Sequence, residues 1–92
     1  CELEYIREYL GMTQALVHHL GSTIRDLRKE AGMSQIVFGE KCGFYQTYLS
    51  RIENGSANPT INAIEVMAKG LGLSFFELLD LVKLRIEQAS LR

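Results

Sequence analysis

The stretch QIVFGEKCGFYQTYLSRIEN, residues 35–54, decides the fold. It reads as two short helices separated at Gly43, a residue that tolerates the positive φ of a tight turn. Gly39 lies midway along the first helix, where two crossing helices need a small side chain. The expected anchors to a core are Phe38, Leu49 and Ile52. This pattern predicts a helix-turn-helix unit with one polar face left free.

Helical patterns continue on both sides of this unit. Before it, Ser22 or Thr23 can cap a helix over 22–31; after it, Thr60 can cap a helix over 61–69. Ser74 and Glu77 form a capping box ahead of an apolar helix that reaches about residue 90. Residues 2–19 predict one kinked helix or two short ones. Because no segment alternates with period two, the expected fold is all-α, with five core helices and an N-terminal helical extension.

Length and composition favour one small domain. The chain has 92 residues, of which 47% are apolar, and a net charge of −1. That charge gives no general support for nucleic-acid binding, so a phosphate-binding face must come from local arrangement. We divide the chain into an extension, residues 1–19, and a helix-turn-helix domain, residues 20–92, which ends in a dimerisation helix.

The two cysteines, Cys1 and Cys42, predict neither a disulfide framework nor a metal site. Cys42 falls in an apolar helical pattern and is expected to be a small core residue. Neither a signal peptide nor a membrane-spanning run is visible, which favours a reducing cytoplasm. A start at Cys1 instead of Met suggests that the native chain extends further.

Several motifs in order resemble the phage-repressor family (Cro/C1, or XRE). They are Gly32-Met33-Ser34-Gln35, Glu40-Lys41-Cys42-Gly43, residues 48–55 (YLSRIENG), Asn58-Pro59-Thr60 and Leu71-Gly72-Leu73-Ser74. The match covers residues 20–81. The resemblance implies a five-helix DNA-binding domain that acts as a dimer on a palindromic site, with residues 45–54 as the helix that enters the major groove.

The resemblance also implies contact residues. The predicted DNA-binding set is Gln35, Tyr45, Gln46, Thr47, Ser50, Arg51, Asn54, Ser56 and Asn58. Within it, Gln46 suits adenine and Arg51 suits guanine, while the backbone N–H of Gln35 would meet a phosphate and its amide would brace Gln46. Residues of the following loop would bind phosphates. Arg28 and Glu53 occupy the family positions of a semi-buried ion pair.

Three residues depart from the family pattern. Ile36 and Val37 replace the usual polar pair after Gln35, and Tyr45 is bulky for the exit of the turn. These departures put the DNA target in doubt, and leave the fold unaffected.

The last helix carries more apolar residues than one core-facing stripe needs. The predicted dimer interface is Leu78, Leu81, Val82, Leu84 and Arg85. The N-terminal stripe of Leu3, Ile6 and Leu10 would cover this helix, in its own chain or in the partner's. The alternative is that both segments complete an enlarged monomeric core.

We therefore predict a transcriptional regulator of double-stranded DNA, with repression favoured, that is a homodimer without cofactor, metal or enzymatic activity. His18 and His19 lack partners at ligand spacing, Tyr5 and Tyr9 suit a packed helix face, and no catalytic grouping is visible. A contact with polymerase is compatible with this prediction. The alternative function is an antitoxin that grips a toxin and regulates its own synthesis.

Overall fold

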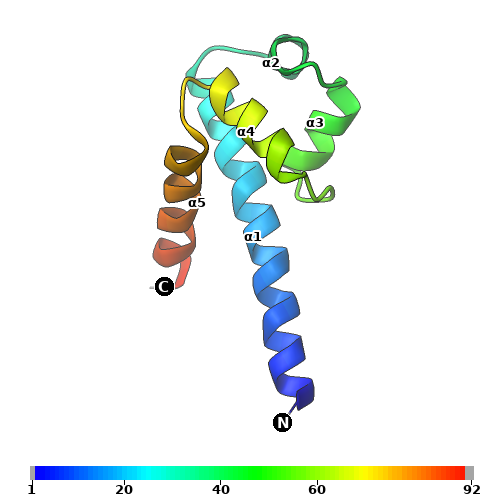
Figure 1. Cartoon of the computed structure of the whole chain (residues 1–92), viewed down its shortest axis with the longest axis vertical. Helices are drawn as coiled ribbons and strands as arrows, with labels where there is room; N and C mark the ends of the chain where they lie inside the picture. Colours follow the sequence, from blue (N-terminus) through cyan, green and yellow to red (C-terminus); the bar gives the residue numbers. More distant parts are fainter. Residues whose placement is uncertain (1, 91–92) are drawn as a thin grey trace.

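The computed structural model describes the backbone of residues 2–90 and the side chains of residues 16–89. This part of the chain contains helices and no strand, which confirms the all-α prediction. The helices are α1 (Glu2–Glu30), α2 (Gln35–Cys42), α3 (Gln46–Glu53), α4 (Ile61–Gly70) and α5 (Phe75–Ser90). α2 and α3 lie at one end of the molecule, and the N-terminal half of α1 projects from the other (Figure 1).

The first helix is longer than expected. The predicted start at Ser22 or Thr23 is wrong, because α1 runs without interruption through the boundary between extension and domain. The hydroxyls of Ser22 and Thr23 donate to the backbone oxygen of His19, at 3.2 and 2.6 Å, so they bond back along the helix and do not cap it. The side chains of the predicted N-terminal stripe, and of Tyr5 and Tyr9, lie outside the described residues.

Gly21 lies at the point where α3 crosses α1. A Cβ at this position would overlap the backbone oxygen of Ile52 and lie 2.9 Å from that of Glu53. The C-terminal turn of α3 therefore crosses α1 at backbone contact. The crossing therefore requires a glycine at this position.

The core draws on all five helices. Its buried members are Leu20, Ile24, Phe38, Leu49, Ile52, Met67, Ala68, Leu78 and Val82. The three anchors predicted for the helix-turn-helix unit are among them. Cys42 packs at the edge of this core, and burial raises the pKa of its thiol.

The turn and the helix starts follow the expected local chemistry. Gly43 has φ of 76° and closes α2, while a Cβ on Gly39 would lie 2.8 Å from the oxygen of Phe44. The hydroxyls of Ser34 and Thr60 accept from N–H groups three residues on. Ser74 and Glu77 exchange two hydrogen bonds, at 2.9 and 3.1 Å, so the capping box is confirmed.

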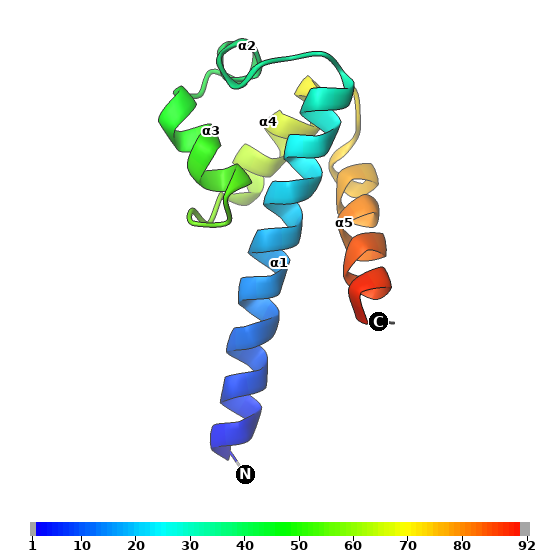
Figure 2. The same cartoon turned by 180° about the vertical axis from the view of Figure 1, so that it is seen from behind.

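The predicted dimer-interface residues on α5 separate into two groups. Leu78 and Val82 are buried in the chain's own core, so their assignment to a partner-facing surface was wrong. α5 packs along α1, as both views show (Figure 2), and Arg85 Nη1 contacts Asp26 Oδ2 at 2.8 Å. Leu81 is half-buried, and Leu84 remains 50% exposed. Of the predicted apolar set, these two can still meet a second chain.

A buried ion pair fastens α3 to α1. Arg28 Nε lies 2.8 Å from Glu53 Oε2, and Arg28 Nη2 lies 3.0 Å from Glu53 Oε1. The Nη1 group donates to the oxygen of Met33 at 2.8 Å. The two side chains are only 7% and 1% exposed. This two-pronged geometry satisfies the charges that burial removes from water.

We predict that Gly21→Ala destabilises the protein, although alanine is intrinsically the better helix residue by about 1 kcal/mol. The added methyl meets two backbone oxygens, so α3 must move, at a cost of about 1–3 kcal/mol. Urea unfolding followed by circular dichroism measures the change. Ser22→Ala, one residue along, is the control and should stay within about 0.5 kcal/mol. A stabilised Gly21→Ala variant would contradict the close crossing.

We predict that Glu53→Gln lowers the free energy of unfolding by about 3–5 kcal/mol, because it strands a buried guanidinium. The matched control is Glu65→Gln in the exposed Glu65–Lys69 pair on α4, where about 0.5 kcal/mol or less is expected. Replacing both partners, Arg28→Met with Glu53→Leu, should recover much of the loss. Equal effects at the buried and exposed glutamates would refute the assignment.

Candidate nucleic-acid interface

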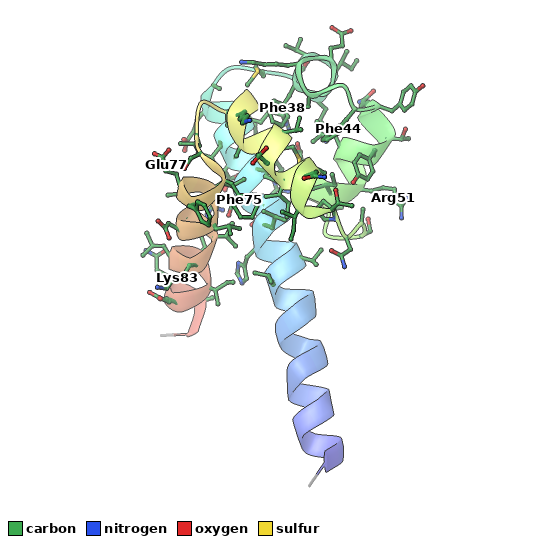
Figure 3. All side chains as sticks on the ribbon, viewed as in Figure 1. Phe38, Phe44, Arg51, Phe75, Glu77 and Lys83 are labelled. Carbon is green, nitrogen blue, oxygen red and sulfur yellow. The ribbon has the colours of Figure 1, made fainter. Side chains whose placement is uncertain are left out.

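α3 has one anchored face and one free face. Leu49, Ile52 and Glu53 are buried against the rest of the molecule. The predicted base-reading residues Gln46, Thr47 and Arg51 are exposed, and Ser50 is half-buried. In Figure 3, Phe38 and Phe44 lie between the helices, while Arg51 extends outward from α3. The free face is therefore a polar ridge at the surface.

The start of α2 lies beside the start of α3. Gln35 Nε2 donates to Glu53 Oε1 at 3.1 Å, and Gln46 Nε2 donates to Gln35 Oε1 at 3.4 Å. The second contact is the expected brace between the two glutamines. The first N–H groups of a helix have no acceptor inside it, and they lie at the positive end of its dipole. α2 thus presents donors next to the polar ridge of α3.

The loop after α3 carries the remaining predicted contact residues. Asn54, Ser56 and Asn58 are exposed. The Ser56 hydroxyl donates to the oxygen of Arg51 at 3.3 Å, so its hydrogen is already used in this structure. Gly55 has φ of 76°, and a Cβ there would lie 3.3 Å from the Cα of His18. The loop is held against α1, with both asparagines at the surface.

Apolar groups adjoin the polar ridge. Ile36 and Val37 are 55% and 51% exposed at the start of α2, and Tyr45, which precedes α3, is 86% exposed. None of the three side chains packs in the core. The residues that depart from the family pattern are thus surface residues, consistent with an effect on target choice and not on folding.

The polar surface carries little formal charge. Among the predicted contact residues, Arg51 is the only ionised side chain. Its Nη2 donates to the backbone oxygen of Ser56 at 3.5 Å, a contact that engages only one of the five N–H donors of the guanidinium. Hydrogen-bonding amides, hydroxyls and helix ends therefore dominate this interface.

Sequence reasoning missed three contacts between distant parts of the chain: the close approach at Gly21, the Gln35–Glu53 hydrogen bond and the Asp26–Arg85 pair. The Gln35–Glu53 contact joins residues 18 apart, and the Asp26–Arg85 contact joins residues 59 apart. Helical periodicity carries no signal for such separations. An open hollow of about 490 Å³ between α1 and α5 was also not expected. Its lining residues are His18, His19, Ser22, Arg85, Gln88 and Ala89.

Within residues 16–89, His, Cys, Asp and Glu side chains form no group of three or more that could hold a metal ion. None of the described helices is long and apolar enough to cross a membrane.

Known proteins share this arrangement. A family model described as helix-turn-helix matches residues 24–78. The HTH-type transcriptional regulator y4dJ of Sinorhizobium fredii is 41% identical over 59 residues, which cover 64% of this chain and 77% of that protein. The control protein C.BamHI of Bacillus amyloliquefaciens is 34% identical over 70 residues, or 75% of this chain and 86% of that one.

A solved structure agrees with these sequence matches. The wild-type restriction-modification controller protein C.Esp1396I superposes with a TM-score of 0.74 at 32% identity, covering 79% of this chain and 95% of that one. The family model alone spans more than half of the chain, including both helices around Gly43. The chain therefore belongs to the helix-turn-helix family of DNA-binding transcriptional regulators.

Proposed function

We propose that this protein reads a specific duplex DNA sequence with α3, and that it regulates transcription from that site as a homodimer without enzymatic activity. The observation that carries the proposal is the polar ridge from Gln46 to Arg51, which is exposed while the opposite face of α3 is anchored in the core. A helix held in this way can enter the major groove without rearrangement of the fold.

Each part of the surface has a distinct role in this proposal. Gln46 reads a base near the start of α3, and Arg51, further along the helix, pairs with guanine through two hydrogen bonds. The N-terminus of α2 and the amides of Asn54 and Asn58 bind phosphates and set the register. Ile36 and Tyr45 contact sugars or thymine methyl groups beside the ridge.

The proposed dimer uses α5 and a two-fold axis. Leu84 is 50% exposed, and Leu81 is half-buried beside it on the same helix. A self-complementary contact at this face presents two copies of α3 about 34 Å apart, one turn of the duplex, and so requires a palindromic operator. Repression follows when the bound dimer occludes a promoter.

The first test is the pair Gln46→Ala and Arg51→Ala. We expect loss of about 2–6 kcal/mol of discrimination between selected and scrambled duplex, because each two-pronged base contact contributes about 1–3 kcal/mol. Fluorescence anisotropy at fixed salt measures it, with operators obtained by selection from random duplex DNA.

Glu65→Ala with Lys69→Ala, on exposed α4 positions, is the matched control and should keep full discrimination. Helicity of both double variants should equal that of the parent. If the Gln46/Arg51 variant still separates operator from scrambled DNA, the base-reading assignment is wrong.

The second test concerns the dimer. Leu84→Glu places a charge in the proposed apolar contact and should convert dimer to monomer, with binding to a full palindrome reduced to that of a half-site. Sedimentation equilibrium gives the mass and anisotropy gives the affinity. Val66→Glu, a similar substitution at an exposed apolar position of α4, should remain dimeric. A Leu84→Glu variant with unchanged mass would exclude this interface.

A further inference from the structure

Four side chains form one continuous series of hydrogen bonds from the interior to the N-terminal end of α3. We name this series the Arg28–Gln46 relay; its members are Arg28, Glu53, Gln35 and Gln46. The successive distances are 2.8 and 3.0 Å from Arg28 to Glu53, 3.1 Å from Gln35 to Glu53, and 3.4 Å from Gln46 to Gln35. Its inner end is buried and its outer end is exposed.

The Glu53 carboxylate determines which atoms donate and which accept along the relay. The Glu53 carboxylate, paired with a guanidinium, can only accept hydrogen bonds. Gln35 must therefore turn its Nε2 group toward Glu53, which leaves its Oε1 facing Gln46. Gln46 must in turn donate one N–H of its own Nε2 group to that oxygen. A reversed amide at either glutamine would set two donors or two acceptors against each other.

This pattern of donors and acceptors determines which amide atoms of Gln46 remain available to DNA. With one N–H engaged by Gln35, the remaining edge of the amide consists of the Oε1 acceptor and the second N–H. Adenine offers the complement in the major groove, an N7 acceptor beside an N6 donor, whereas guanine offers two acceptors. Against guanine, the Oε1 atom would meet O6 with no hydrogen between them.

We propose that the buried Glu53 carboxylate, acting through Gln35, sets the base preference of Gln46 for adenine over guanine. This inference rests on the proposed function, since it assumes that α3 reads duplex DNA. It makes Glu53 and Gln35 positioning residues, in addition to their part in holding α3 on α1. The exposed Gln46–Gln35 contact strengthens when DNA excludes water from it.

The experiment is binding-site selection from random duplex DNA, followed by affinities for matched duplexes. The position read by Gln46 is the one whose preference disappears in Gln46→Ala. At that position we expect the parent protein to prefer adenine over guanine by about 5-fold to 150-fold, equivalent to about 1–3 kcal/mol. The ratio of the two dissociation constants is the readout, because a general loss of folding or phosphate contact leaves it unchanged.

Two variants of Gln35 separate positioning from simple packing. Gln35→Met keeps the length of the side chain without its amide, and should bring the adenine-to-guanine ratio close to one. Gln35→Lys supplies donors only, to Glu53 and to Gln46 Oε1, so Gln46 should turn its NH₂ group outward and favour guanine. Glu65→Gln is the control on α4 and should retain the parent ratio.

Distinct outcomes overturn the inference. A parent protein that selects a DNA sequence but prefers guanine at this position, or a Gln35→Met variant with the parent ratio, refutes the relay while DNA reading stands. If Gln46→Ala alters no position, Gln46 reads no base and the inference fails in the same way. If the parent protein selects no sequence at all, the proposed function fails and the relay with it.

Discussion

The docking of α3 on α1 is the constraint on which the rest of the structure depends. Two features meet there: the buried pair of Arg28 and Glu53, and the backbone contact allowed by Gly21. A desolvated ion pair is stabilising only when its geometry is nearly ideal, so the helix can adopt few orientations. With Leu49 and Ile52 also in the core, that orientation forces the ridge from Gln46 to Arg51 to face outward.

The parts of the fold that could be predicted from sequence are those determined by neighbouring residues. A cap such as Ser34 or Thr60 acts on an N–H group three residues away, and Gly43 acts through its own φ. The capping box at Ser74 and Glu77 is equally local. The helix starts after these caps were predicted within about a residue, because each signal and its effect share one turn of chain.

The errors arose where a residue's role depends on a distant element. Ser22 was expected to cap a helix start, but α3 lies against the neighbouring Gly21 and α1 continues through both positions. The apolar residues of α5 showed that more than one stripe existed, yet periodicity could not assign Leu78 and Val82 to the core and leave Leu84 outside. The Gln35–Glu53 bond was invisible for the same reason, although the family resemblance supplied both of its neighbours, the ion pair and the glutamine brace.

Because the proposed contact surface carries little charge, discrimination between bases depends strongly on the orientation of its polar side chains. Non-specific affinity for DNA comes mainly from cations near phosphates, and this chain has a net charge of −1 with Arg51 as the only ionised member of its predicted contact set. A protein with weak general attraction to DNA depends more on the contacts that discriminate between bases. Gln46 can discriminate only if its amide is held one way round, and an exposed amide rotates freely unless something fixes it. In this molecule the buried Glu53 carboxylate orients the amide of Gln35, which in turn orients the amide of Gln46. The buried charge that holds α3 on α1 therefore also sets the orientation of the exposed Gln46 side chain.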